Sequence, residues 1–215
     1  MFKIEKIDLL ISLYIFCIMV SELMGGKTVP IVRLFGYQLN GSVSLLTLPF
    51  IFSVNDVITE VYGKQRTRSI IRSGLVMVFL VFIFSLVATA LPPSTRFAAR
   101  EAAYDTIFQL SARIAASSLT AFALAEFLDL FIFVKLRERL KQYGLWFRNN
   151  VSNIIAQFVD TSVFMFLAFY AFNRPFGDNA TYLWSLILPY WLLKCFMSVI
   201  ETPLVYWGVR WLKEK

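Results

Sequence analysis

The pattern of apolar and polar positions divides the chain into six long hydrophobic runs with short polar segments between them. The runs cover about 7–26, 43–62, 70–91, 109–134, 151–172 and 182–209. Because a helix that crosses a membrane needs about 20 mostly apolar residues, each run is long enough to span one. The pattern therefore predicts an all-α integral membrane protein in which residues 1–215 form a single bundle of six transmembrane helices.

The polar segments predict connecting loops rather than a soluble domain. Segment 27–42 contains Pro30 and Gly36 and is amphipathic, so we expect an outer loop that lies on the membrane surface or dips into it. No small-residue cleavage site follows the first run, and Glu22 and Lys27 come directly after its apolar core. We therefore expect a retained first helix rather than a cleaved secretory signal.

Positive charge is distributed unequally between the two sides of such a bundle. The net charge is +7, with 21 Lys and Arg against 14 Asp and Glu. Fourteen of the 21 basic residues lie before the first run, after the last, in the segments that follow the second and fourth runs, or, as Arg72, at the very start of the third run, whereas five lie in the other connecting segments. By the positive-inside rule this asymmetry predicts that both termini are cytoplasmic. We expect a multi-pass protein of the cell inner membrane, in contact with membrane lipid, and no binding of nucleic acid.

The residue types present argue against a metal centre and against most forms of catalysis. The chain has no histidine, and its two cysteines, Cys17 and Cys195, lie in separate apolar runs. Without a cluster of such ligands we expect no metal, no cofactor and no disulfide. An intramembrane enzyme in which Asp56 and Asp160 meet as acid and base is a disfavoured alternative, because no nucleophile motif accompanies them.

Ionisable side chains inside the apolar runs are the main functional signal. Seven of the 14 acidic residues lie within the runs or at their inner ends, together with Arg113 and Lys194. A charge at the bilayer centre costs about 2.5–3.5 kcal/mol even on a lenient scale, so such groups mark a polar site or pathway. With 22 Phe, nine Tyr and five Trp to supply flat walls, the composition favours a cavity for a small planar molecule.

The second run places two carboxylates on one helix face. Asp56 and Glu60 are four residues apart, and Asn55 precedes them directly. All three are candidate ligand contacts. For Asp56 the alternative is a structural partner of another helix, and for Glu60 it is an interfacial anchor paired with Lys64 or Arg66.

The fourth run repeats this arrangement nearer its inner end. Glu126 and Asp129 are three residues apart and again share a helix face. Both are candidate ligand contacts, although Asp129 could instead meet the basic segment that begins at Lys135.

The fifth run carries the most regular polar pattern. Its polar positions recur at intervals of three, four and three, which places Asn150, Asn153, Gln157 and Asp160 on one helical stripe. A single amide could form a stabilising hydrogen bond between two helices, but four polar groups in line favour a face that contacts a ligand. In the sixth run Lys194 lies roughly midway, and two roles stay open for it: a counter-ion to a buried carboxylate or a direct ligand contact.

Four segments around these polar residues carry a family resemblance. They are PFIFSVNDVITEVYG, RIAASSLTAFALAEFLDLFIFVKLR, WFRNNVSNIIAQFVDTSVFMFLAF and the start of the sixth run, nearly half of the chain. They resemble the queuosine precursor transporter family, also called the vitamin uptake transporter family. The resemblance implies an inner-membrane carrier of 7-deazaguanine precursors of the tRNA base queuosine, such as the 7-cyano and 7-aminomethyl compounds. It also implies a fold like that of the substrate-binding subunits of energy-coupling-factor vitamin importers.

The resemblance also implies a set of site residues. The motif positions that it carries over are Asn55, Asp56, Glu60, Asp129, Arg148, Asn149, Asn150, Gln157, Asp160, Thr161 and Lys194. Relatives usually have Gln at the position of Glu126. A carboxylate there favours a cationic ligand such as the aminomethyl base, or a modified base, so which deazaguanine is carried stays open. A guanine-type edge offers two neighbouring N–H groups to one carboxylate, for which Asp160 or Glu126 is predicted. Gln157 or Asn153 is predicted to serve the carbonyl edge.

The energy source of transport stays open. The alternative to a self-sufficient carrier is the substrate-binding subunit of an ATP-driven energy-coupling-factor importer. The chain contains no GxxxxGK phosphate-binding loop, so ATP would have to be used by a partner. The Ala-x-x-x-Ala pattern that docks such subunits is absent from the first run, which disfavours an ATPase partner. Proton symport and facilitated diffusion are both compatible with the sequence.

Overall fold

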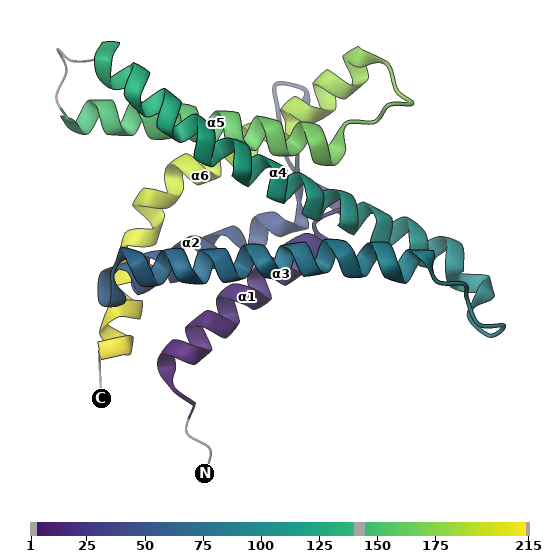
Figure 1. The fold of residues 1–215 in the computed structure, drawn as a ribbon. Helices are drawn as coiled ribbons and strands as arrows, with labels where there is room; N and C mark the ends of the chain where they lie inside the picture. Colours follow the sequence, from purple (N-terminus) through teal and green to yellow (C-terminus); the bar gives the residue numbers. More distant parts are fainter. Residues whose placement is uncertain (1–3, 140–144, 214–215) are drawn as a thin grey trace. The chain divides into compact units, whose positions relative to one another are not determined.

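Long α-helices make up most of the described chain. The computed structural model describes the backbone of residues 4–139 and 145–213, and the side chains of these residues outside 125–153 and 198–202. The helices, drawn in Figure 1, are α1 (Lys6–Met24), α2 (Leu48–Tyr62), α3 (Lys64–Ala90), α4 (Glu101–Arg139), α5 (Leu145–Phe169) and α6 (Phe176–Lys213), with short 3-10 turns η1 (Val43–Leu46) and η2 (Ala98–Arg100).

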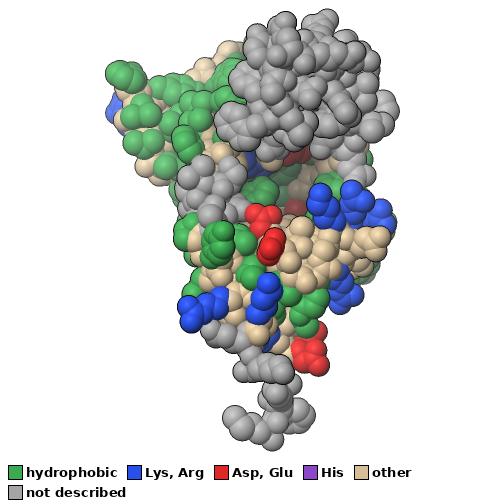
Figure 2. Space-filling view, turned by 90° about the vertical axis from the view of Figure 1, so that its left-hand side faces the viewer, with side chains coloured by type: hydrophobic (Ala, Val, Ile, Leu, Met, Phe, Trp, Pro, Cys, Tyr) green, Lys and Arg blue, Asp and Glu red, His purple; other side chains and the backbone are tan. Residues whose placement is uncertain are grey.

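The lengths and compositions of these helices fit a membrane protein. Within the described residues, four segments are long and apolar enough to cross a membrane, and a shorter one is apolar as well: Lys6–Met24, Val43–Tyr62, Lys64–Ala90, Ala98–Leu124 and the shorter Ile154–Phe169. Many large hydrophobic side chains are exposed, as expected of helices surrounded by lipid, and Figure 2 shows patches of them on one face together with Lys and Arg. A helical, multi-pass membrane protein is thereby confirmed, while the six-span bundle with cytoplasmic termini stays a prediction.

Several helices extend beyond the apolar runs that predicted them. α3 begins at Lys64 rather than near 70, and α6 begins at Phe176 rather than near 182. The first turns of α3 are rich in Lys, Arg and Gln, which are good helix formers although they are not apolar. Hydrophobicity therefore located the part of each helix suited to lipid but not where the helix starts.

Segment 27–42 differs from the loop that the sequence predicted, because it folds into a β-hairpin. β1 (Thr28–Leu34) pairs with β2 (Tyr37–Ser42). The two residues between the strands, Phe35 and Gly36, have φ of 49° and 82°. Positive φ at both positions of a two-residue loop matches the twist of paired strands. Glycine adopts such a φ freely, and the β-branched residues of β1 favour an extended backbone.

The chain forms two compact units, which are described separately. The first unit joins Ser42–Ala116 to the stretch before Pro30 and the stretch after Cys195. In it α1, α2 and α3 pack against one another, as Figure 1 shows. Their contact is centred on four buried side chains, Tyr14, Val54, Ile58 and Ile70, surrounded mainly by isoleucines of α1, α2 and α3.

A single residue connects α2 to α3. Gly63 has φ 83° and ψ 163°, a backbone conformation that is essentially restricted to glycine. Across this joint the hydroxyl oxygens of Thr59 and Thr67 lie 2.8 Å apart in a hydrogen bond. The joint fixes the C-terminal half of α2, which carries Asp56 and Glu60, against the start of α3.

In the second unit, Pro30–Gly41 and Ser117–Cys195, the hairpin lies along the first turns of α6. The amide nitrogen Nδ2 of Asn40 donates to the hydroxyl of Ser185 at 2.9 Å. The hydroxyl of Tyr37 donates to the backbone carbonyl of Thr181. β2 is therefore attached to α6 at two points one helical turn apart.

One side chain closes the connection between α5 and α6. Asn179 is 2% exposed, and its Oδ1 accepts from the backbone N–H of Ala171 at 2.9 Å. Its Nδ2 donates to the carbonyl of Ala171 at 2.8 Å and lies within 3.3 Å of the carbonyls of Arg174 and Pro175. Asn179 thereby holds the end of α5 against the start of α6.

Candidate functional site

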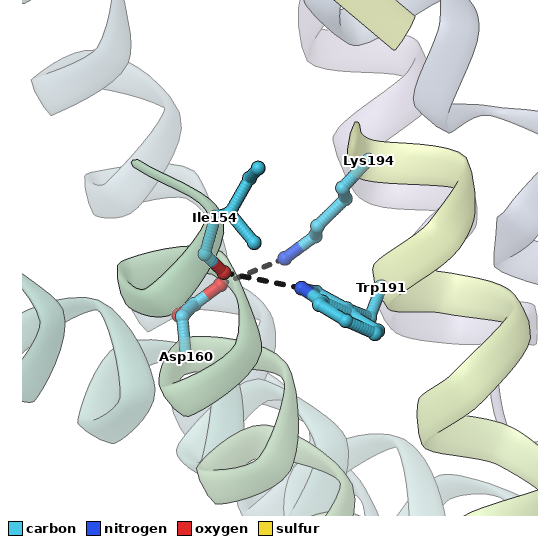
Figure 3. A network of polar contacts seen from close by, with 4 residues as sticks. All are labelled: Ile154, Asp160, Trp191 and Lys194. Atoms are coloured by element: carbon cyan, nitrogen blue, oxygen red, sulfur yellow. Dashed lines mark hydrogen bonds and ion pairs between the residues drawn. The ribbon is translucent and has the colours of Figure 1, made fainter. Parts of the chain in front are cut away.

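An ion pair between α5 and α6 is the centre of the candidate site. Lys194 Nζ donates to Asp160 Oδ2 at 2.7 Å, as Figure 3 shows. The side chain of Lys194 is 14% exposed and that of Asp160 is 28% exposed. At this burial each charge offsets part of the cost of removing the other from water. This contact is the one expected of Lys194 as a counter-ion, and a direct contact of Lys194 with a ligand stays a prediction.

Aromatic side chains lie beside the ion pair. Trp191, one turn before Lys194 on α6, donates its indole N–H to the carbonyl of Ile154 at 3.1 Å (Figure 3). The ring of Phe158 packs edge-on against Trp191 with the centroids 5.3 Å apart, and lies 6.0 Å from the ring of Trp184. The hydrogen bond and the ring contact fix the indole plane of Trp191, so the site has a flat wall of defined orientation.

Two further predicted residues of α5 lie close in sequence to Asp160. Gln157 is half-buried, and Thr161 is 1% exposed. Within the part of the chain that the structure describes, the Thr161 hydroxyl has no hydrogen-bond partner, and Asp160 Oδ1 accepts none. A buried polar group without a partner costs about 1–3 kcal/mol, so it is a natural contact for water or for a ligand. The second unit therefore offers one charged pair and open acceptor capacity beside it.

The predicted residues of α2 belong to the first unit. Asp56 and Glu60 are exposed on one face of the helix, and the other face is buried. Asn55 Oδ1 is buried and, among the described residues, has no hydrogen-bond partner. No ion pair joins Glu60 to Lys64 or Arg66, all of which are described, so the contact that the interfacial-anchor alternative expected for Glu60 is absent.

Five predicted residues have side chains outside the described part of the chain: Glu126, Asp129, Asn149, Asn150 and Asn153. Because the α2 residues and the α5–α6 residues belong to separate units, their convergence on one chamber stays a prediction. The structure brings together Asp160 and Lys194, and it places Gln157 and Thr161 on the same helix as Asp160.

Sequence reasoning missed the aromatic residues of this site. From the number of Phe and Trp residues it inferred that aromatic rings line the cavity, but it singled out no individual ring. The available signal was spacing, since Trp191 is three residues before Lys194 and therefore shares its helix face. Phe158 could not have been assigned as its partner, because the register between α5 and α6 is not visible in the sequence.

Comparison with known proteins identifies the family. Residues 42–208, most of the chain, match the family model described as "Putative vitamin uptake transporter". The chain belongs to this family. It is a family of transporters, which agrees with the expectation of a carrier rather than an enzyme, and the resemblance found in the sequence segments is confirmed.

Three curated relatives of this chain carry related names. A "Probable queuosine precursor transporter" of Bacillus subtilis is 29% identical over 183 residues, which is 84% of this chain and 76% of the relative. One of the same name from Haemophilus influenzae is 31% identical over 76% of this chain and 66% of its own length. The "Queuosine precursor transporter" of Escherichia coli is 26% identical over 72% of this chain and 66% of its own length. No solved structure matches this chain.

Proposed function

We propose that this chain imports queuosine precursors, planar 7-deazaguanine bases, across the cell inner membrane. The Asp160–Lys194 pair is the observation that carries the proposal, because it sets a carboxylate and an ammonium side by side next to an aromatic wall. The names of the three relatives support the substrate class. The family match supports the transport activity.

The chemistry of the pair suits the edge of a guanine-like base. Such an edge presents an N–H and an adjacent NH2 group, which one carboxylate can accept with its two oxygens. Lys194 contacts Asp160 at Oδ2, and Oδ1 remains able to accept from a ligand. An ammonium has three N–H donors, so Lys194 can also donate to the carbonyl oxygen of the base. Hydrogen bonds to charged groups are about twice as strong as neutral ones and give directional selectivity.

The aromatic wall suits the flat shape of the base. A planar ring that stacks on Trp191 gains about 0.5–1.5 kcal/mol beyond the burial of its area. Because Trp191 is held by Ile154 and Phe158, this surface is in place before a ligand arrives. A preformed surface saves the entropy of ordering a side chain on binding.

The remaining predicted residues complete the proposed site. Gln157 and Thr161 add neutral donors and acceptors on α5, and Glu126 would neutralise the cationic arm of an aminomethyl base. The other proposed contacts are Asn55, Asp56, Glu60, Asp129, Asn149, Asn150 and Asn153. Their mixture of carboxylates and amides matches a ligand that has both donors and acceptors.

Uptake of labelled base by cells tests the proposal. The host is a bacterial strain that cannot synthesise the 7-deazaguanine base and lacks its own importer. The wild-type chain is expected to restore uptake, and Asp160→Asn is expected to lower it at least tenfold. Asp178→Asn, an exposed carboxylate at the start of α6, is the matched control and should leave uptake unchanged.

Two outcomes would contradict the proposal at different levels. Wild-type protein that is inserted in the membrane but takes up none of the deazaguanines would refute the substrate class. Uptake that persists undiminished in Asp160→Asn would remove Asp160 from the site while leaving the function standing. Reconstitution of the purified chain alone in liposomes then separates a self-sufficient carrier from one that needs an ATPase partner.

A further inference from the structure

A polar groove runs along the first turns of α3, and none of the residues that line it is among those proposed for transport. It has a volume of about 450 Å³ and is lined by Gln65, Arg68, Ser69, Arg72, Ser73 and Val76. These positions are spaced by three and four residues, so they form one continuous face of the helix. All of them are exposed and belong to the first unit.

The groove holds two cations without a protein counter-ion. Arg68 and Arg72 are one helical turn apart, and among the described residues neither guanidinium forms an ion pair or a hydrogen bond. Two like charges at this spacing repel each other, so an anion between them is favoured. The hydroxyl of Ser73 donates to the carbonyl of Ser69 at 3.0 Å, and the Ser69 hydroxyl adds a further donor at the groove. Guanidinium and hydroxyl groups are typical partners of a phosphate.

The same helix face continues as an apolar strip. Beyond the groove, Val76, Leu80, Ile83 and Val87 follow at helical spacing, with 53%, 51%, 41% and 50% of their surfaces exposed. At 1.5 Å per residue, the distance from Val76 to Val87 is about 16 Å. This is close to half of the roughly 30 Å hydrocarbon core of a bilayer. The face therefore joins a cationic end to an apolar strip about as long as one leaflet is thick.

We propose that this face of α3 binds one anionic phospholipid of the cytoplasmic leaflet. The phosphate lies between Arg68 and Arg72, and one acyl chain lies along the strip from Val76 to Val87. The unequal distribution of basic residues predicts that this end of α3 is on the cytoplasmic side. Charge complementarity selects an anionic headgroup, and the apolar strip selects a lipid over a soluble anion. This inference does not depend on the proposed substrate.

Simple snorkelling of arginines to the membrane surface predicts a different behaviour. In that case every basic residue near the start of α3 contributes equally, because each interacts with the averaged potential of the membrane surface. A built site instead gives one saturable lipid and depends on the two arginines of the groove. Lys64 and Arg66 are exposed on the same turns but do not line the groove, so they provide the comparison.

Native mass spectrometry of the purified full chain in neutral detergent tests the site. We expect one phosphatidylglycerol to be retained at least tenfold more tightly than phosphatidylcholine of the same chain length. The double variant Arg68→Gln with Arg72→Gln should lose this preference about tenfold. The control, Lys64→Gln with Arg66→Gln, removes the same charge and should keep the preference. Circular dichroism checks that each variant retains its helices.

Three results would overturn the proposal. Equal loss in the two double variants would indicate a general surface charge effect. Equal binding of phosphatidylglycerol and phosphatidylcholine would show that the headgroup charge is not recognised. Binding of soluble glycerol phosphate as tight as that of long-chain phosphatidylglycerol would show a site for free phosphate, because the apolar strip would then contribute nothing. A series of acyl chain lengths should instead show affinity that rises with length.

Discussion

Lys194 and Asp160 join α6 to α5 through a 2.7 Å contact between Nζ and Oδ2. One turn away, Trp191 on α6 donates to the carbonyl of Ile154 on α5 at 3.1 Å. One link is ionic and the other is neutral, and together they set the register between the two helices. The groups proposed to contact the substrate therefore also determine how the helices around it are aligned.

Breaking the ion pair from one side is expected to destabilise the protein. Lys194→Met leaves the Asp160 carboxylate without its counter-ion. The expected loss lies between the about 1 kcal/mol of an exposed pair and the about 3–5 kcal/mol of a fully buried one, because Asp160 is 28% exposed. Thermal unfolding in detergent, followed by tryptophan fluorescence, measures it. Lys213→Met, an exposed lysine near the end of the same helix, is the control.

The double variant Asp160→Asn with Lys194→Gln separates stability from binding. Both charges are removed together, so most of the stability lost in Lys194→Met should return. Binding of the deazaguanine base should not return, since the carboxylate acceptor is gone. A double variant that binds as tightly as the wild type would show that the pair is structural and not part of the site.

Asn179 is expected to be important for the stability of the second unit. In Asn179→Ala the N–H and carbonyl of Ala171 lose their partner, which costs about 1–3 kcal/mol for buried groups. Asn179→Asp keeps an acceptor for that N–H but loses the donors, so its effect should be intermediate. Asn173→Ala, an exposed neighbour in the same connection, is the control. Equal melting temperatures for Asn179→Ala and Asn173→Ala would contradict this role.

Alkaline pH should loosen the attachment of the hairpin to α6. Burial raises the pKa of the Tyr37 phenol above its ordinary value of about 10, and the neutral hydroxyl donates to the carbonyl of Thr181. The folded-state pKa is the higher one, so this contribution is complete below about pH 10 and is lost as the pH rises through the raised pKa. Difference absorbance of tyrosinate, compared between the wild type and Tyr37→Phe, reports the titration of Tyr37. Tyr62→Phe, at an exposed tyrosine outside the hairpin, is the control and should leave the attachment of the hairpin to α6 unchanged.

The close packing of α3 on α1 depends on the small size of Gly74. A Cβ at this position would lie 2.8 Å from Ile18 Cδ1 and 3.2 Å from Tyr14 Cε1. Gly74→Val is therefore expected to lower the free energy of unfolding by about 1–3 kcal/mol, as overpacking usually does. Gly177→Val serves as the control, because a Cβ there meets nothing within 4 Å. Thermal melting of both variants measures the difference.

Apolar patterning predicted the helices well and the hairpin badly. The strongly apolar stretch of α3 is unmistakable because almost every residue from Leu75 to Ala90 is apolar or small. The hairpin is short, and its turn has Phe35 where an Asn or Asp would give a recognisable signal before Gly36. When hydrophobicity is averaged over windows of about 20 residues, the signal of so short a hairpin is lost among the neighbouring residues.

The site was predictable as a set of residues but not as a set of contacts. Asp160 was identified by the polar stripe on the fifth run. Lys194 was identified because it is a charged residue within an otherwise apolar run. The sequence did not show that Lys194 pairs with Asp160 rather than with another carboxylate, because it does not determine which helices are neighbours. The role of Trp191 was invisible for the same reason: its partner is the backbone carbonyl of Ile154, a group that every residue has.

Because a single residue, Gly63, connects α2 to α3, α2 and the start of α3 form one rigid unit. The hydroxyl contact between Thr59 and Thr67 braces the corner, so a swing of α2 must either break that contact or carry α3 with it. α3 has 27 residues and is about 40 Å long, so a small rotation at this pivot displaces its far end by several ångströms. A reorientation of α2 that preserves the Thr59–Thr67 contact therefore displaces α3 along its whole length.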